Sequence, residues 1–352
     1  MEKAALGLSQ PAVISDALHR PLRSLRVSVT DRCNLRCAYC MPEARYDWLP
    51  NPSLLSFEEI ARLVARFQSL GVTKVRLTGG EPLVRRELPT LIEQLSALGL
   101  KELALTTNGV LLAPIASALA RAGLHRLTVS LDTLSAERFF QLSRRTQHAE
   151  VLAGIDAALE AGLAPLKLDT VLMRGVNDDE IVPLLAFARA RGAELRFIEY
   201  MDVGGATRWN SQLVVSRSEL LARLTEAFGA APRPLPERDS APAERFLLPD
   251  GQVFGIIAST TQPFCGTCDR VRLTADGQLL TCLYATRGTD LRALVRSGAD
   301  DAALEATLRS VWQARRDRGA EDRARLASLR GPLRTASELA AEPHLQMHRR
   351  GG

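Results

Sequence analysis

The chain has 352 residues, of which 46% are hydrophobic and 24% charged, with a formal net charge of +5 and a sequence pI near 9.0. This is the composition of an ordinary globular protein with room for one large α/β domain and a smaller one, and no stretch of about eighteen uncharged apolar residues or N-terminal signal core occurs. We therefore expect a cytoplasmic protein that binds no membrane, and we take the basic excess only as a hint of an anionic partner.

Residues 1–20 show no periodic pattern and are interpreted as a leader. After them, short runs rich in leucine or β-branched residues alternate with amphipathic stretches. The expected strands are residues 25–30, 74–78, 102–107, 126–130, 165–172 and 194–200. The expected helices are residues 56–70, 88–98, 113–122, 149–161 and 181–191. The first of these helices begins with a capping box formed by Ser56 and Glu59.

Six such alternations favour a parallel sheet with right-handed crossovers, and they stop two units short of a closed eight-stranded barrel. The expected fold class is α/β: an open (β/α)6 partial TIM barrel over residues 21–235, followed by a small α+β domain over residues 236–330 and a tail over residues 331–352. In such sheets, ligands bind at the C-terminal ends of the strands.

The expected second domain follows a linker rich in proline and charge at residues 231–242. Its predicted elements are strands at residues 245–248, 253–257 and 271–274 and helices that start at Leu291 and Asp301. This domain is smaller than the barrel and does not continue its regular alternation of strands and helices.

Three cysteines, Cys33, Cys37 and Cys40, follow directly on the first expected strand. Three thiolates on one short loop can hold three irons of a [4Fe–4S] cluster and leave the fourth iron open to a ligand from outside the protein. A zinc site is the first alternative, but structural zinc usually has four N or S ligands, and no histidine lies nearby in the sequence. A disulfide framework is less favoured in a chain without a secretory signal.

The CxxxCxxC loop, with an aromatic residue before its last cysteine, resembles the signature of the radical S-adenosylmethionine (SAM) enzyme superfamily. The resemblance implies that SAM chelates the open iron and that an electron from a donor such as flavodoxin or ferredoxin cleaves it to methionine and a 5′-deoxyadenosyl radical. Residues 78–82, by themselves an ordinary turn after a strand, then match the glycine- and glutamate-containing motif that grips the SAM amino group. The implied SAM contacts are Tyr39, Gly80, Glu81, Ser130 and Met201.

A second set of three cysteines, Cys265, Cys268 and Cys282, lies in the expected second domain, and the two sets account for all six cysteines. We expect this set to hold a second [4Fe–4S] cluster with an open iron that can bind a substrate atom. The alternative is a zinc site, which would need a further ligand such as His125 or His148.

Basic residues recur on one face of the expected strands. Because side chains alternate between the two faces of a strand, Arg26, Arg76, Lys167 and Arg196 point away from the face of their apolar neighbours, which the helices cover. A barrel interior is normally filled with aliphatic side chains, and a buried cation without a partner costs several kcal/mol. The pattern predicts a polyanionic ligand inside the barrel, unless these strands are shallow and their cations reach solvent.

These features together resemble, more narrowly, the family of radical SAM cyclases that act on GTP in molybdenum-cofactor synthesis. The matching segments are residues 25–33, the second cysteine set with residues 268–272, and the terminal residues 351–352. The resemblance implies that C3′ of GTP is joined to C8, that the second cluster holds the purine, and that cyclic pyranopterin monophosphate synthase consumes the product. The implied GTP contacts are Arg26, Lys74, Arg76, Thr107, Lys167, Arg196, Arg270, Val271 and Arg272, and the implied catalytic residues are Arg26, Arg270, Arg272, Gly351 and Gly352.

Two other interpretations stay open. A radical SAM enzyme that modifies peptides would usually have more cysteines for its auxiliary clusters than the three that remain after the first loop. A non-enzymatic module that binds zinc or RNA would use the basic excess, although we expect no nucleic-acid partner. We expect a monomer or a homodimer.

Overall fold

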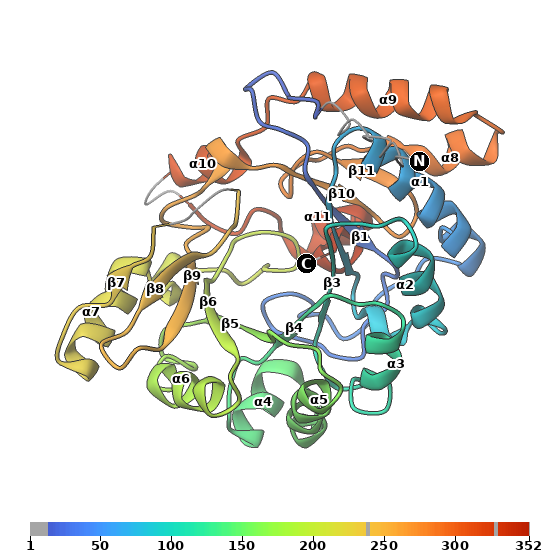
Figure 1. The fold of residues 1–352 in the computed structure, drawn as a ribbon. Helices are drawn as coiled ribbons and strands as arrows, with labels where there is room; N and C mark the ends of the chain where they lie inside the picture. Colours follow the sequence, from blue (N-terminus) through green and yellow to red (C-terminus); the bar gives the residue numbers. More distant parts are fainter. Residues whose placement is uncertain (1–12, 237–239, 327–329, 352) are drawn as a thin grey trace, which may run out of the picture.

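The computed structural model describes residues 13–236, 240–326 and 330–351. In these ranges one sheet of twelve strands has the order β12-β11-β10-β1-β2-β3-β4-β5-β6-β9-β8-β7. Its centre is formed by β1 (Ser24–Ser28), β2 (Lys74–Thr78), β3 (Glu102–Thr107), β4 (Arg126–Ser130), β5 (Lys167–Leu172) and β6 (Glu194–Glu199), all parallel. Figure 1 shows the sheet curving around a central space, with helices on its outer side.

The outer helices follow the strands in alternation. They are α1 (Phe57–Ser69), α2 (Leu88–Ser96), α3 (Ala116–Arg121), α4 (Ala136–Ser143), α5 (His148–Glu160) and α6 (Ile181–Ala190). The open partial barrel and all six predicted strands are confirmed, as are the five predicted helices. Helix α4 was not predicted, because eight residues are too few for a helical period to stand out.

Helix α1 begins where the capping box was predicted. Ser56 Oγ accepts the Glu59 N–H at 3.1 Å, and the Glu59 carboxylate accepts the Ser56 N–H at 2.7 Å. These two bonds satisfy backbone donors that the first turn of a helix leaves without partners. The inner face of α1 then buries Leu63, Val64 and Phe67 against the sheet.

The C-terminal strands extend the barrel sheet on both sides. They are β7 (Arg233–Pro234), β8 (Glu244–Leu247), β9 (Val253–Ile257), β10 (Arg270–Leu273), β11 (Gln278–Leu280) and β12 (Thr289–Asp290). Strand β9 pairs parallel with β6, and β10 pairs parallel with β1. The strands expected to form a separate domain therefore share one sheet with the barrel, a pairing that the sequence pattern did not predict.

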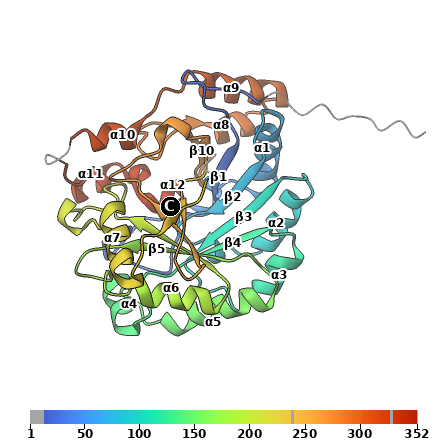
Figure 2. The same ribbon diagram turned by 60° about the vertical axis from the view of Figure 1, so that its left-hand side comes forward.

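The remaining helices are α7 (Arg217–Phe228), α8 (Leu291–Arg296), α9 (Asp301–Gln313), α10 (Gly319–Ala324), α11 (Ala336–Ala341) and α12 (Met347–Arg350). Short 3-10 turns cover Asn51–Ser53, Pro82–Val84, Ser211–Leu213, Cys265–Thr267 and Pro343–Leu345. Helices α8 and α9 fold back beside α1 in both views (Figure 1, Figure 2), where Arg62 Nε donates to Asp301 Oδ1 at 2.9 Å. The C-terminal segment thus braces the first helix of the barrel.

The core lies between the sheet and its helices. Leu25, Val27, Val75 and Leu77 on β1 and β2 are at most 1% exposed on that side. Burying one such side chain contributes about 1.5–3 kcal/mol. Arg26 lies on the opposite face, in the wall of a cavity, so the predicted direction of the basic face is confirmed on this strand.

Part of the expected leader belongs to the fold. Ile14, Asp16 and Arg20 are buried, and Ser15 forms a β-bridge with Pro21. Arg20 Nε donates to Asp16 Oδ2 at 2.6 Å, and Arg20 Nη1 donates to the Cys265 carbonyl at 2.9 Å. Residues 1–12 lie outside the described residues. No helix in the part of the chain that the structure describes is long and apolar enough to span a bilayer.

Candidate active site

A cavity of about 370 Å³ lies inside the barrel, toward the C-terminal ends of the strands. Both cysteine sets line it, although more than two hundred residues separate them in the sequence. Its wall includes all six cysteines, the five predicted SAM contacts Tyr39, Gly80, Glu81, Ser130 and Met201, and the predicted GTP contacts Arg26, Thr107, Arg270 and Arg272. The fold therefore brings most of the predicted site residues together.

The first cysteine set lies on a loop that hydrogen bonds fix to α4. The N–H groups of Arg36 and Ala38 donate to the carbonyls of Ser143 and Leu142, each at 2.9 Å. Burial raises the pKa of the Cys33 thiol to about 11 and that of the Cys40 thiol to about 12. Thiolates at these positions need a positive partner, and three free thiols on one loop fit three irons of a [4Fe–4S] cluster.

The zinc alternatives gain no support from the geometry. In the described ranges, no three His, Cys, Asp or Glu side chains are grouped as a single metal ion requires. The ligands of a cubane cluster each bind a different iron, so they stand further apart than the ligands of one ion. His125 Nδ1 accepts the Leu103 N–H at 3.1 Å and His148 Nε2 lies 3.1 Å from the Thr133 carbonyl, so both rings have partners other than the cysteines.

Gly80 is required by the cysteine loop itself. Its N–H donates to the Thr30 carbonyl, and the Glu81 N–H donates to the Arg32 carbonyl, both at 2.8 Å. A Cβ at Gly80 would lie 2.4 Å from the Arg32 carbonyl oxygen. The glycine thus allows β2 to end against the backbone of the cysteine loop, a reason that the sequence analysis did not give.

Glu81 connects the ends of two strands to this loop. Its carboxylate accepts from Thr107 Oγ1 and from the Asn108 N–H, each at 2.7 Å, and burial raises its pKa to about 7. Asn108 Nδ2 in turn donates to Asn34 Oδ1 at 2.7 Å. Thr107, a predicted GTP contact, therefore lies on the side of the cavity that the first cysteine set occupies.

Asp132 is a cavity residue that sequence reasoning missed. It accepts the Tyr39 hydroxyl at 2.6 Å and the Val171 N–H at 2.8 Å, and burial raises its pKa to about 6. It follows β4 by two residues, at the sheet edge where ligands bind. That position was the available signal, but a single aspartate after a strand is also common in ordinary turns.

Three arginines lie side by side on the inner face of three neighbouring strands. Arg272 on β10 is opposite Arg26 on β1, and Arg26 is opposite Arg76 on β2. We call these three residues the arginine row. Strands are about 4.8 Å apart, and like charges directly opposite one another destabilise a sheet. Burial, followed by the charges of Arg272 and Arg76, lowers the pKa of Arg26 well below its usual range, while Asp169 opposes this shift.

The other predicted GTP contacts differ in position. Lys74, Arg76, Lys167 and Arg196 are absent from the cavity wall. Lys74 and Lys167 are the first residues of their strands. Arg76 pairs with Glu102 at 3.7 Å and Arg196 with Glu194 at 2.8 Å. Burial and the charge of Arg196 lower the pKa of Lys167 to about 7. Val271 points into the core and is 2% exposed, so that only its backbone can face a ligand.

The tail enters the barrel. A Cβ at Gly351 would lie 2.3 Å from Thr78 Oγ1 and 3.5 Å from Ser28 Cβ, and its φ of +72° is a conformation that favours glycine. Arg272 Nη1 donates to the Gly351 carbonyl. The last described residues of the chain lie among the strands of the barrel in both views (Figure 1, Figure 2). Gly352 lies outside the described residues.

The first cysteine loop and the segment that follows it hold the tail in place. The His348 ring meets Tyr46 and Trp48 edge-on, with centroids 5.0 and 5.7 Å apart. The Arg36 guanidinium lies over both aromatic rings, at 5.6 and 5.4 Å. Arg349 Nη2 donates to the Asp47 carbonyl at 2.6 Å. These contacts could not be predicted from local patterns, because they join segments about three hundred residues apart.

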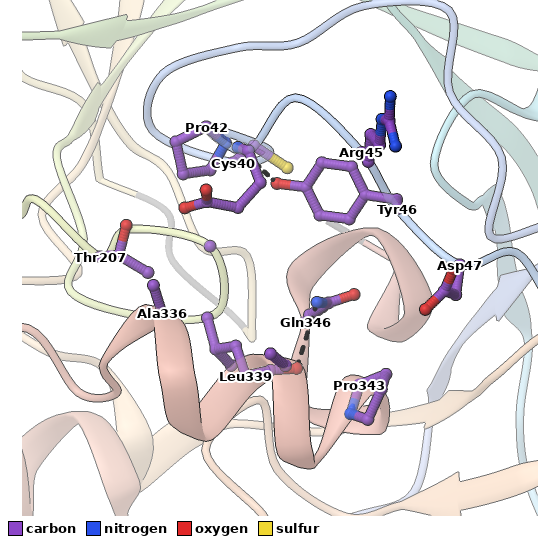
Figure 3. Close-up of a pocket in the computed structure, with 13 residues that line it drawn as sticks. Cys40, Pro42, Arg45, Tyr46, Asp47, Thr207, Ala336, Leu339, Pro343 and Gln346 are labelled. Carbon is purple, nitrogen blue, oxygen red and sulfur yellow. Dashed lines mark hydrogen bonds between the residues drawn. The ribbon is translucent and has the colours of Figure 1, made fainter.

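A smaller pocket of about 130 Å³ lies between this loop and the tail (Figure 3). Cys40 and Tyr46 line one side of it, and Leu339 and Gln346 of the tail line the other. Gly205 closes the wall next to Cys40, where a Cβ would lie 1.6 Å from the Cys40 carbonyl oxygen. The loop after β6 thus packs directly against the backbone of Cys40, the last cysteine of the first set.

We expect Gly205→Ala to displace this cysteine. The overlap is with backbone, which no side-chain rotation can relieve, so the loss of stability should exceed the about 1–3 kcal/mol typical of overpacking. Denaturant unfolding and iron content after anaerobic reconstitution measure both effects. Gly331→Ala is the matched control, since a Cβ there meets nothing within 4 Å. Unchanged stability and iron in Gly205→Ala would refute the close contact.

Two family models match the chain in succession. The model described as the Radical SAM superfamily matches residues 27–188, and the model described as Molybdenum Cofactor Synthesis C matches residues 193–321. The second match begins just before β6. The first model therefore covers the strands up to β5, and the second covers the strands from β6 onward.

Curated relatives match almost the whole chain. GTP 3′,8-cyclase 1 of Mycobacterium tuberculosis is 53% identical over 344 residues, which cover 96% of this chain and 95% of the relative. The GTP 3′,8-cyclase of Acidothermus cellulolyticus is 50% identical over 328 residues, 90% of each chain. Among solved structures, SuiB of Streptococcus suis bound to S-adenosylmethionine has a TM-score of 0.60 and 16% identity over 83% of this chain and 69% of that chain. At this identity, the likeness shows the fold alone.

Proposed function

Because the chain belongs to the GTP 3′,8-cyclase family of radical SAM enzymes, we propose that its two cysteine sets hold two [4Fe–4S] clusters on either side of bound SAM and GTP. Members of this family act in molybdenum-cofactor synthesis with SAM and an iron–sulfur cluster. The activity of this chain is the conversion of GTP to (8S)-3′,8-cyclo-7,8-dihydroguanosine 5′-triphosphate, an early step of that synthesis.

In the proposed arrangement Cys33, Cys37 and Cys40 hold the first cluster, which with SAM supplies the 5′-deoxyadenosyl radical. Tyr39, Gly80, Glu81, Ser130 and Met201 then orient SAM in the same part of the cavity. The buried Glu81 and the half-buried Asp132 both have backbone donors as partners, so they can hold a polar ligand without moving.

The second cluster is proposed at Cys265, Cys268 and Cys282. Although burial opposes the effect, the charges of Arg270 and Arg315 lower the pKa of Cys268 to about 7, which prepares this thiol to bind iron. Arg315 Nη2 lies 3.3 Å from Cys268 Sγ, and Arg270 Nη2 lies 3.6 Å from it. Because this set faces the same cavity as the first, its open iron can hold the purine near SAM.

The observation that carries the substrate assignment is the arginine row. Two members of the row, Arg26 and Arg272, line the cavity together with Arg270. One aspartate of the wall, Asp169, offsets part of their charge, so an anion with several charges can lie among these three guanidinium groups. A triphosphate has that charge, and arginine pairs with phosphate through two parallel hydrogen bonds. A peptide substrate offers no such charge, and none of the observed contacts favours it.

We expect affinity to rise with the number of phosphates, from guanosine through GMP and GDP to GTP. Arg26→Ala should weaken GTP binding by about 10–100-fold, because Arg26 lines the cavity and a charged hydrogen bond contributes about 1.5–3 kcal/mol. Calorimetric titration measures both effects, and iron content should be unchanged. Arg121→Ala, on the exposed surface of α3, is the control. Equal affinities for guanosine and GTP would contradict the phosphate-binding role of the row.

Two partners complete the proposal. The electron that cleaves SAM comes from a flavodoxin or a ferredoxin, and the product passes to cyclic pyranopterin monophosphate synthase. Both follow from the family and from the chemistry, which needs a reductant and yields a cyclised nucleotide that a further enzyme must process. The catalytic roles of Arg26, Arg270, Arg272, Gly351 and Gly352 are likewise proposed, with support from the contact between Arg272 and Gly351 inside the barrel.

A further inference from the structure

The outer face of α4 exposes a large aromatic side chain. Phe140 is 53% exposed, the highest value among the exposed large hydrophobic residues of the described ranges. Its neighbour Phe139 is buried and lines the cavity on the other side of the same helix. An exposed aromatic residue surrounded by polar groups is a common anchor of protein–protein interfaces.

Two arginines lie next to this phenylalanine. The Arg144 N–H donates to the Phe140 carbonyl at 2.8 Å, and its side chain is exposed at the end of α4. Arg145 Nε donates to the Asn34 carbonyl of the first cysteine loop at 3.1 Å. Together with the exposed Ala38, these residues form a surface that we call the α4 patch: Ala38, Phe140, Arg144 and Arg145.

The α4 patch carries a positive charge. Glu137, one turn before Phe140, is the exposed acidic residue of the helix itself. Arg138, which pairs with Glu180 and Asp179, lies two residues before Phe140 and thus about 200° around the helix from it, on the other side of α4. Two arginines thus outweigh one glutamate around an exposed aromatic ring, a composition typical of interfaces.

The patch is the outer surface of the wall that carries the first cysteine set. The carbonyls of Leu142 and Ser143 accept the N–H groups of Ala38 and Arg36, on either side of Cys37. The end of α4 and the cysteine loop therefore form one hydrogen-bonded unit. Leu142 from this unit lines the cavity, while Ala38 faces outward.

We propose that the α4 patch is the docking site of an acidic protein that carries a one-electron donor, a reduced flavin or iron–sulfur centre. The proposal rests on the proposed function, which assigns a cluster to Cys33, Cys37 and Cys40. One electron leaves the partner's centre, which is oxidised, and reduces that cluster, while no bond breaks and no proton moves. The arginines steer the acidic partner, and Phe140 anchors it. A second copy of this chain fits less well, since its patch has the same charge.

The first test is binding of a labelled flavodoxin to the full-length reconstituted protein, followed by fluorescence anisotropy. Phe140→Ala and Arg144→Glu should each weaken binding about tenfold, as expected for an anchor and for a steering charge. Added salt should weaken binding by the wild type more than by Arg144→Glu. Val182→Ala, which replaces another exposed hydrophobic residue, and Arg121→Glu are the controls. Wild-type affinity in both patch variants would overturn the proposal, as would the absence of binding by the wild type.

The second test separates docking from catalysis. Stopped-flow reduction of the clusters by reduced flavodoxin should be about tenfold slower in Phe140→Ala and in Arg144→Glu. Reduction by dithionite, which needs no docking site, should keep its wild-type rate, and so should dithionite-driven deoxyadenosine formation. Equal slowing with both reductants would overturn the docking role. Failure of the wild type with dithionite would instead contradict the proposed function, and the binding measurement would still decide the docking question.

Discussion

Replacing Cys40 with alanine should abolish the formation of 5′-deoxyadenosine. Cys40 is one of three thiols on the first loop, and a cluster held by two thiolates cannot keep the geometry that presents its open iron to SAM. We expect iron from the second set to be retained, about half of the wild-type content, since each set is proposed to hold one four-iron cluster. Iron and sulfide analysis and chromatography of the reaction mixture measure the two outcomes.

Cys265→Ala is the matched variant on the other side of the cavity. It should also lose about half of the iron, but it should retain the first cluster and the ability to cleave SAM slowly. It should fail to cyclise GTP, because the purine is no longer held near SAM. Full turnover of GTP by Cys265→Ala would contradict the substrate-holding role of the second set.

Deleting Gly351 and Gly352 should remove most of the cyclase activity and leave both clusters and GTP binding nearly intact. Gly351 lies between Ser28 and Thr78 and accepts a hydrogen bond from Arg272, so its loss frees a guanidinium of the arginine row to take another position. Activity that depends on such positioning is sensitive to displacements of about 1 Å. Product formation, iron content and calorimetric GTP affinity check the three parts of this expectation.

A point substitution sharpens the same test. A Cβ at Gly351 would overlap Thr78 Oγ1 and would force an unfavourable φ, so Gly351→Ala should impair turnover without shortening the chain. Gly331→Ala, in the same tail but with open space around its Cα, should be neutral. Wild-type activity in both the deletion and Gly351→Ala would show that the tail plays no part in the reaction.

Patterns that are local in the sequence predicted the barrel well. The period of two along β1 and β2 separates Arg26 and Arg76 from Leu25 and Val75, and the structure confirms that these pairs face opposite sides of the sheet. The capping residues predicted the start of α1 in the same way. Helix α7 was missed, although Ser216 accepts the Glu219 N–H at 3.2 Å in a similar arrangement.

Contacts between distant segments could not be predicted in this way. The pairing of β9 with β6 and of β10 with β1 depends on which edge of the sheet is free once the six central strands have formed. The contact of His348 with Tyr46 and Trp48 depends in turn on where the tail passes the cysteine loop. The role of Gly205 appears only when Cys40 is known to lie against it. None of these features leaves a periodic pattern or a spacing in the sequence.

The central claim is that this barrel cyclises GTP between two clusters. The most direct measurement is an anaerobic incubation of the reconstituted, reduced protein with SAM and, separately, each of the four common nucleoside triphosphates. We predict that 5′-deoxyadenosine and a 3′,8-cyclised nucleotide form together with GTP, and that the other triphosphates give no cyclised product. Deoxyadenosine without any change in GTP, or an equal yield of cyclised product from another triphosphate, would contradict the account.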